Sequence, residues 1–182
     1  MSILLKDQIL KEYESGRIVI SPYTCSQLGP NSYDVRISPM LKTYKLENDG
    51  FLDCKHENET NVIIMPEEGF ILEPGILYLG ATMEKVGSKF HIPMYEGRSS
   101  MARLGIQSHL SAGFGDIGFT SNWTLEITVV HKTKIYPHMR IGQVYFHEID
   151  ESSNLENNRY HGKYSTQVDP QESLSYIDYV DH

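Results

Sequence analysis

Short segments of alternating or continuous apolar residues, separated by turn-forming residues, run through most of this chain. They are the segments 17–20, 33–37, 62–65, 76–79, 124–129 and 140–146. Glycine, proline and asparagine interrupt the chain between them, as in Gly29-Pro30-Asn31 and Pro74-Gly75. Many short strands at this spacing are typical of an all-β sandwich or barrel. The sequence therefore predicts an all-β fold, and residues 1–182 contain no linker or repeat that would divide them into domains.

One segment near the N-terminus has helical periodicity instead. Leu5, Ile9 and Tyr13 recur every four residues, with Leu10 beside them, and this spacing places apolar side chains on one face of a helix. Gly16 follows, where a helix can end on a residue in the left-handed region. The sequence predicts one short N-terminal helix ahead of the strands.

The C-terminal stretch, roughly residues 150–182, is polar but unusually rich in tyrosine for a disordered segment. Four tyrosines lie in it: Tyr160, Tyr164, Tyr176 and Tyr179. We interpret it as a mobile tail that becomes ordered over a ligand or a neighbouring subunit.

The charge balance restricts what the protein binds. Lys and Arg number 16 against 24 Asp and Glu, a formal net charge of −8 over 182 residues. A protein that coats DNA or RNA needs many cations to neutralise phosphates, so a nucleic-acid polymer is not expected as partner. A few local arginines can still hold a small anion. No secretory signal or membrane-spanning run is evident, so we expect a cytoplasmic protein that does not contact membranes.

The segment 96–105 concentrates groups that bind phosphate. Arg98, Ser99, Ser100 and Arg103 provide two guanidinium groups and two hydroxyls within six residues, with Gly97 and Gly105 on either side. Guanidinium groups match the geometry of phosphate oxygens, and serine hydroxyls can complete an anion site. The alternative is a short helix whose first turn carries solvated arginines.

A glycine-rich segment follows at 108–119. Three glycines in a short window indicate a tight turn or backbone pressed against another group. Small residues beside Phe119 suit a flat ring, and Asp116 can accept a hydrogen bond from a hydroxyl. The alternative is an ordinary glycine-rich hairpin.

Glu126 is a carboxylate within an apolar strand. Leu125 and Ile127 share one face of that strand, whereas Thr124, Glu126 and Thr128 share the other. If the polar face is enclosed, Glu126 becomes a candidate proton carrier; if it faces solvent, Glu126 is an ordinary strand residue.

Taken together and in this order, the segments 96–105, 111–119 and 123–127 resemble motifs of the dCTP deaminase family. The segments 30–36, 139–143 and 162–167 resemble three more of its motifs, so the resemblance covers nearly the whole chain. It implies a dUTPase-like β-barrel or jelly roll that forms a homotrimer with active sites shared between subunits.

The resemblance also implies the reaction, which is deamination of dCTP to dUTP and ammonia without a catalytic metal. The sequence lacks the H-x-E and P-C-x-x-C motifs that a zinc deaminase needs, so zinc is not expected. Mg²⁺ is implied only as a companion of the triphosphate. dTTP is implied as an inhibitor.

Roles follow residue by residue from the matched motifs. Three residues are implied to be catalytic: Glu126 as the proton carrier, Ser99 positioning the water, and Arg103 beside them. Ten are implied to bind substrate: Arg98 and Ser100 at the phosphates, Asp116 at the sugar 3′-hydroxyl, Thr124 and Leu125 at the base through their backbone, Ala112 and Phe119 packing on the nucleotide, and Lys163, Tyr164 and Gln167 from the tail. Tyr160 is a weaker candidate, because its spacing differs from that of the family.

The product and the reaction class stay open at this point. Ala112-Gly113-Phe114 resembles bifunctional members that convert dCTP to dUMP and pyrophosphate, whereas members that only deaminate often carry histidine after the alanine. A dUTPase is a rival, although Phe119 stands where that family usually has tyrosine. A non-catalytic nucleotide-binding regulator and a jelly-roll sugar-binding protein are more distant alternatives.

Overall fold

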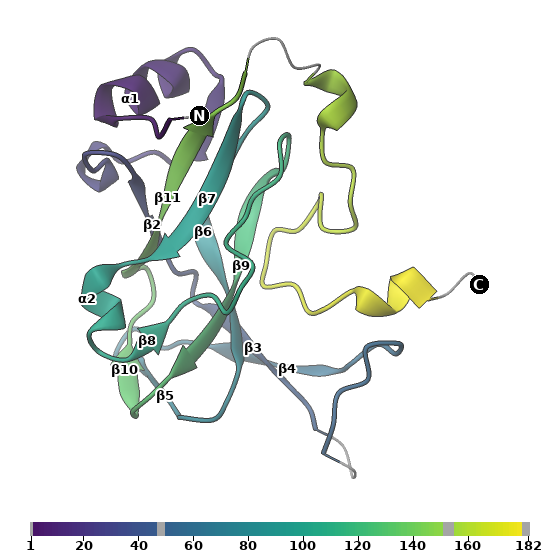
Figure 1. Ribbon diagram of the computed structural model, residues 1–182. Coiled ribbons are helices and arrows are strands. Elements are labelled where there is room, and N and C mark those ends of the chain that lie inside the picture. Colours follow the sequence, from purple (N-terminus) through teal and green to yellow (C-terminus); the bar gives the residue numbers. More distant parts are fainter. Residues whose placement is uncertain (1, 47–49, 151–154, 180–182) are drawn as a thin grey trace.

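The computed structural model of the protein describes residues 2–46, 50–150 and 155–179, and Figure 1 shows its largely β architecture. The helices are α1 (Lys6–Glu14) and α2 (Ser99–Ala102), with 3₁₀ turns at Cys25–Gln27, Glu156–Asn158 and Ser175–Tyr179. The strands are β1 (Ile18–Ser21), β2 (Tyr33–Arg36), β3 (Met40–Tyr44), β4 (Thr60–Ile64), β5 (Phe70–Leu72), β6 (Tyr78–Ser88), β7 (His91–Gly97), β8 (Ile106–Gln107), β9 (Thr120–Val129), β10 (Thr133–Ile135) and β11 (Arg140–Glu148).

Within the described residues, the strands form three antiparallel sheets. The largest has the order β4-β3-β6-β9-β8, with β1 also paired to β6, and a second has the order β2-β11-β7. Strands β10 and β5 pair by themselves. Strands that are distant in the chain are therefore neighbours in space, an arrangement typical of sandwich and barrel folds. The predominance of strands confirms the all-β prediction.

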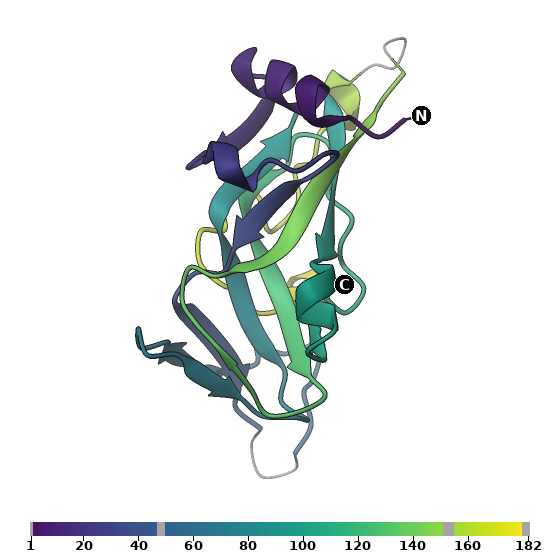
Figure 2. The ribbon, with the colours of Figure 1, turned by 90° about the vertical axis from the view of Figure 1, so that its left-hand side faces the viewer.

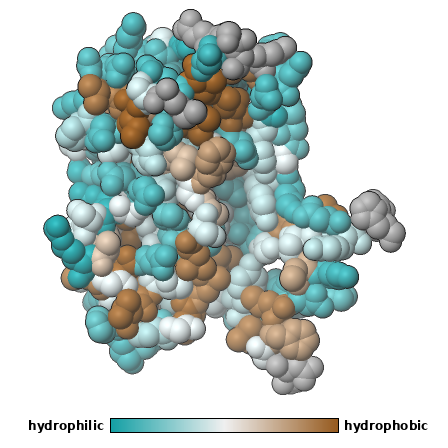
Figure 3. All heavy atoms as spheres, in the orientation of Figure 1, coloured by the Kyte–Doolittle hydropathy of each residue, from teal (hydrophilic) through white to brown (hydrophobic). Residues whose placement is uncertain are grey.

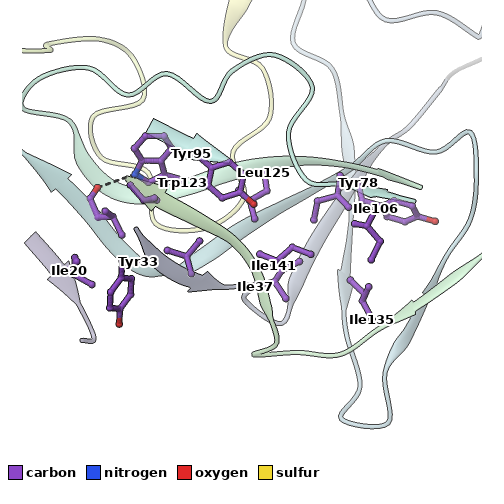
Figure 4. Close-up of a cluster of buried hydrophobic side chains, with 14 of the residues drawn as sticks. Ile20, Tyr33, Ile37, Tyr78, Tyr95, Ile106, Trp123, Leu125, Ile135 and Ile141 are labelled. Atoms are coloured by element: carbon purple, nitrogen blue, oxygen red, sulfur yellow. Dashed lines mark hydrogen bonds between the residues drawn. The ribbon is translucent and has the colours of Figure 1, made fainter. Parts of the chain in front are cut away.

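Aromatic and branched side chains fill the space between the two larger sheets (Figure 4). Tyr95 of β7 packs against Trp123 of β9 with ring centroids 6.5 Å apart. Trp123 also donates a hydrogen bond from Nε1 to the carbonyl oxygen of Val86, at 3.0 Å. Burying a tryptophan requires a partner for its N–H, and this bond supplies it. Strand β9, which carries Trp123, is thereby fixed within the core.

The N-terminal helix forms as predicted and lies across one end of the sheets (Figure 2). Ile9 of α1 is fully buried. The helix ends at Glu14 with Ser15 as its C-cap, and Gly16 adopts φ +75°, a conformation that favours glycine. No helix in the described part of the chain is long and apolar enough to cross a membrane.

Five strands fall outside the predicted segments: β3, β5, β7, β8 and β10. In β7 the reason is Pro93, which has no N–H to donate and so argued against a strand. β7 is the edge strand of its sheet: Pro93 lies opposite Phe146 of β11, and the other side of β7 contacts the loop at 113–115 through an isolated bridge. The carbonyl of Pro93 accepts from Gly115 N–H of that loop, so the missing N–H of the proline faces the loop and not the ladder with β11.

Candidate active site

A cavity of about 390 Å³ lies between β9, the loop before it and the C-terminal tail. Figure 3 shows the surface hollowed beside that tail. Of the residues predicted to form a site, the ones that line the cavity are Ala112, Asp116, Phe119, Thr124, Glu126, Tyr164 and Gln167. They come from three segments, so the fold brings together residues that are more than fifty positions apart.

Glu126 reaches the cavity because β9 alternates strictly between buried and half-buried residues. Leu125 and Ile127 point into the core, whereas Glu126 points to the other face, as the sequence predicted. The backbone N–H of Leu110 lies 3.4 Å from Glu126 Oε2 and donates a long hydrogen bond to it. The carboxylate is thus half-buried and held at the cavity wall.

The loop over residues 112–119 is held against β7 by backbone hydrogen bonds. Tyr95 N–H donates to the carbonyl of Gly113 at 2.7 Å, and Gly115 N–H donates to the carbonyl of Pro93 at 2.9 Å. A Cβ on Gly113 would lie 2.5 Å from the Tyr95 carbonyl oxygen, and one on Gly115 would lie 2.3 Å from the Trp123 ring. The glycines therefore permit the close approach that places Ala112 and Asp116 on the cavity.

Aromatic rings form one wall. Phe119 makes edge-to-face contacts with Trp123 at 5.8 Å and with Tyr160 at 5.6 Å between centroids. Tyr160 N–H also donates to the carbonyl of Ile117 at 2.7 Å. Tyr160, whose sequence spacing argued against a role, thus lines the cavity together with Phe119.

The middle of β9 presents backbone as well as side chains. Thr124 Oγ1 accepts a hydrogen bond from the N–H of Gln171 at 3.0 Å. The Leu125 side chain is 1% exposed and belongs to the core, so it does not line the cavity. On the side of β9 away from β6, β8 pairs with Thr128 and Val129. The backbone at 124–125 has no strand partner on that side within the described residues.

The tail forms the opposite wall of the cavity. Gln167 donates from Nε2 to the carbonyl of Asn122 at 2.6 Å, and its own carbonyl accepts a hydrogen bond from Ser121. The Tyr164 hydroxyl accepts from the N–H of Leu174 at 3.0 Å. Lys163 does not line the cavity; its ammonium group pairs with the Asp178 carboxylate.

The arginine–serine segment lies elsewhere on this chain. Ser99 is the first residue of the short helix α2, and a short helix here was one of the two interpretations of the sequence. The cavity is not lined by Arg98, Ser99, Ser100 or Arg103. Arg98 Nε lies 3.3 Å from Asp34 Oδ1, while Ser99, Ser100 and Arg103 are exposed. Within one chain, therefore, Glu126 is not brought together with Ser99 and Arg103.

Several lining residues were not predicted from sequence. They are Tyr44, Leu77, Leu79, Phe114, Gly115, Trp123, Gln171, Glu172 and Ser173. Burial raises the pKa of Tyr44 above its ordinary value, although a hydrogen bond from the backbone of Ser173 opposes the rise. Phe114, Gly115 and Trp123 lie within the motif segments 111–119 and 123–127, although no role was assigned to them. No local motif marks the other six, because they reach the cavity only when β3, β6 and the tail meet.

Comparison with known proteins identifies the family. A family model described as dCTP deaminase-like matches residues 3–149. The chain belongs to this family. Among its curated relatives, dCTP deaminase, dUMP-forming, of Clostridium botulinum (strain Eklund 17B / Type B) is 47% identical, with the match covering 97% of this chain and 98% of the relative. The proteins of the same name from Cytophaga hutchinsonii and Leptospira biflexa are 43% and 42% identical, and each match covers 97% of this chain and 98% or more of the relative.

The fold of this dCTP deaminase-like chain also has a solved counterpart. The crystal structure of 2′-deoxycytidine 5′-triphosphate deaminase from Agrobacterium tumefaciens superposes with a TM-score of 0.62 at 17% identity. The superposition covers 79% of this chain and 47% of that one. At this identity the likeness concerns the fold. In the described ranges, no group of three or more His, Cys, Asp and Glu side chains is arranged to hold a metal ion.

Proposed function

We propose that this protein deaminates dCTP and then hydrolyses the resulting dUTP, releasing ammonia, pyrophosphate and dUMP. The observation that carries the proposal is the cavity in which Glu126, Asp116 and Phe119 meet. It lies in a chain 47% identical, over nearly its full length, to a protein named as a dUMP-forming dCTP deaminase. The main prediction from sequence had dUTP as the released product; the names of the relatives favour its alternative, dUMP.

Glu126 is proposed to move the protons of the deamination. Its carboxylate takes a proton from water, and the hydroxide adds to the ring carbon that bears the amino group. The same carboxyl then passes the proton to the amino nitrogen, which leaves as ammonia. Proton transfer by a positioned carboxylate contributes roughly 10²–10⁴-fold to a rate. The hydrogen bond from Leu110 N–H supports this role because it restrains the carboxylate.

The other cavity residues are proposed to hold the nucleoside. The exposed carboxylate of Asp116 accepts a hydrogen bond from the sugar 3′-hydroxyl, and the Phe119 ring packs on the nucleotide. The backbone at Thr124 and Leu125 reads the base edge, since it has no strand partner on that side in the described chain. Ala112 leaves room for water and ring, because its side chain is a single methyl group.

Phosphate binding is proposed to need a second copy of the chain. Arg98, Ser99, Ser100 and Arg103 lie on and beside an exposed helix outside the cavity. A neighbouring subunit can present these groups to the cavity, as in the homotrimer with shared sites that the sequence resemblance implies. Tyr164 and Gln167 then close from the tail, with Lys163 reaching the triphosphate after it leaves Asp178.

Mg²⁺ is proposed to arrive bound to the triphosphate. Phosphate oxygens are the hard ligands that this ion prefers. Among the described residues, the carboxylates of Asp116, Glu126 and Glu172 line the cavity, and a divalent cation reduces their repulsion of the phosphates. Inhibition by dTTP and a cytoplasmic location complete the proposal.

The geometry at Gly113 supports the dUMP-forming alternative. A Cβ there would lie 2.5 Å from the Tyr95 carbonyl oxygen and 3.2 Å from the His109 ring. A histidine after Ala112, which the resemblance associates with deamination alone, therefore does not fit this loop without moving it. The loop in its present conformation therefore requires glycine at position 113.

The test is to incubate the purified protein with dCTP, and separately with dUTP, in the presence of Mg²⁺. Ammonia, pyrophosphate and the nucleotide products are measured. Ammonia with dUMP and pyrophosphate from dCTP is the expected result. Ammonia with accumulating dUTP would restrict the function to deamination, and pyrophosphate from dUTP without ammonia from dCTP would overturn it.

Replacing Glu126 tests the catalytic assignment directly. Glu126→Gln keeps the shape of the side chain but removes the proton carrier, so ammonia release is expected to fall by at least about 10²-fold while dCTP still binds. The matched control is Glu73→Gln, which alters an exposed carboxylate paired with Lys132 outside the cavity. Retained turnover in the Glu126 variant would remove this residue from the mechanism.

A further inference from the structure

The tail forms one wall of the cavity and is attached to two strands that flank it, in addition to its bonds from Tyr160 N–H to the carbonyl of Ile117 and from Ser175 Oγ to the carbonyl of Cys54. The first attachment is on β9, where Gln167 and Gln171 hydrogen-bond to Asn122 and Thr124. The second is on β3, which lies on the far side of β6 from β9 in the same sheet. Residues that span the cavity between two strands depend on both attachments for their position.

The attachment on β3 consists of Lys42, Tyr44, Glu172 and Ser173, here called the tail clamp. Lys42 Nζ donates to Glu172 Oε2 at 2.6 Å, and Ser173 N–H donates to the Tyr44 hydroxyl at 2.9 Å. Lys42 and Tyr44 are two residues apart in the strand, so their side chains leave the same face of the sheet. Two successive tail residues therefore dock on two side chains of one strand face.

Burial makes the ion pair of the clamp stronger than an ordinary surface pair. The Lys42 and Glu172 side chains are 17% and 22% exposed. In the ion pair Lys45–Glu59, next to the paired strands β3 and β4, the side chains are 43% and 67% exposed. Burial alone would raise the pKa of Glu172, but the bond from Lys42 lowers it below its ordinary value, with help from the residue's own backbone N–H. The carboxylate is therefore held in its charged, paired form.

Lys42 itself does not line the cavity, whereas its partner Glu172 and its strand neighbour Tyr44 do. We propose that Lys42 is a positioning residue for nucleotide binding: its ion pair with Glu172 holds the tail in the position that closes the cavity. The proposal rests on the proposed function only for its kinetic consequence. Without the ion pair, the hydrogen bonds that hold the tail beyond Gln171 to this side of the body, among the described residues, are those of Ser173 with Tyr44 and of Ser175 with Cys54.

We expect loss of the ion pair to weaken the binding of dCTP and to leave the chemical step nearly unchanged. Glu126 lies on β9 within the sheet, so the clamp does not move it. Lys42→Met is therefore expected to raise KM for dCTP roughly 10-fold, with kcat changed by less than about twofold, as fits the loss of one partly buried ion pair. Glu172 lines the cavity, so its replacement by lysine also changes the charge beside the triphosphate. The double variant Lys42→Glu with Glu172→Lys reforms the pair with its charges exchanged, and it is therefore judged by the position of the tail and not by KM.

The experiment follows the tail directly as well as the reaction. Ligand-free protein is treated with chymotrypsin, which cleaves after aromatic residues such as Tyr164 and Tyr176, and the rate of cleavage in the tail is measured by mass spectrometry. We expect cleavage to be roughly 10-fold faster in either single variant and restored in the charge-exchanged one. The control is the exchanged pair Lys45→Glu with Glu59→Lys, for which cleavage and KM should match wild type.

The outcomes separate this proposal from the proposed function. If Lys42 binds phosphate directly, Lys42→Met raises KM without faster cleavage of the tail, which overturns the clamp. Unchanged cleavage in both single variants overturns it too. If wild type releases no ammonia from dCTP, the proposed function fails, but the chymotrypsin rates still decide whether the clamp holds the tail.

Discussion

A buried carboxylate in the centre of the largest sheet gives the sharpest test of how the fold is held together. Glu84 of β6 is completely buried. It accepts three hydrogen bonds: from Arg36 Nε at 2.7 Å, from the Arg36 backbone N–H at 2.8 Å, and from Gln27 Nε2 at 3.0 Å. The proposed perturbation is Arg36→Met, which keeps most of the side-chain volume but removes the charge that compensates Glu84.

The magnitude follows from what the substitution leaves behind. Removing one partner of a buried ion pair costs about 3–5 kcal/mol, because the other charge remains buried and uncompensated. Two of the three hydrogen bonds to Glu84 persist, and the Arg36 side chain is 24% exposed, so water can reach the vacated position. We therefore expect a loss of about 2–4 kcal/mol in the free energy of unfolding.

The assay is urea unfolding followed by circular dichroism at pH 7, with Lys45→Met as the control. That variant breaks the exposed pair with Glu59 and should leave the unfolding midpoint unchanged within error. Adding Glu84→Gln to the Arg36 variant should recover part of the loss, since the amide is neutral. A loss below about 0.5 kcal/mol for Arg36→Met would refute the argument that Glu84 needs this guanidinium to stay buried.

Two further substitutions test the cavity wall and the pH dependence of stability. Gly115→Ala should lower the free energy of unfolding by about 1–3 kcal/mol, because the added Cβ would lie 2.3 Å from the Trp123 ring. It should also shift the fluorescence of Trp123, which is the only tryptophan in the chain. Gly75→Ala, whose Cβ meets open space, should leave that emission unchanged, and equal spectra for both variants would contradict the packing argument. Burial lowers the pKa of His91 below its ordinary 6.5, so the unfolded chain binds a proton that the folded chain does not. The free energy of unfolding should therefore decrease as pH falls below about 6.5. Urea midpoints measured from pH 7.5 to 5.5 should show this decrease, and His91→Gln should make it smaller. The same decrease in the variant would exclude His91 as its source.

The cavity beneath the tail explains why this polar segment carries tyrosines. Tyr160 packs on Phe119, and Tyr164 bonds to the backbone of Leu174, so both rings organise the tail against the body. Each ring has an apolar face to bury and a hydroxyl to hydrogen-bond, which suits a segment that covers a wet cavity. The tail is thus ordered by the same groups that line the site.

Local patterns were enough to predict much of the fold. The alternation around Glu126 determined which side chains of β9 face the core, because the side-chain period of a strand is two. The four-residue spacing before Gly16 marked α1. β7 escaped prediction, since Pro93 is compatible with a strand only at a sheet edge, and edge position is a property of the whole sheet.

The sequence by itself also determined the chemistry available: a carboxylate on a strand, an aspartate among glycines, and guanidinium groups beside serines. Only the tertiary structure decided which of these groups meet. It places Glu126 and Asp116 around one cavity, leaves Arg98 outside it beside Asp34, and docks Glu172 on Lys42, 130 residues earlier in the chain. The physical reason is that periodicity and turn chemistry act over a few residues, whereas a cavity forms where distant strands pair and a tail packs across them.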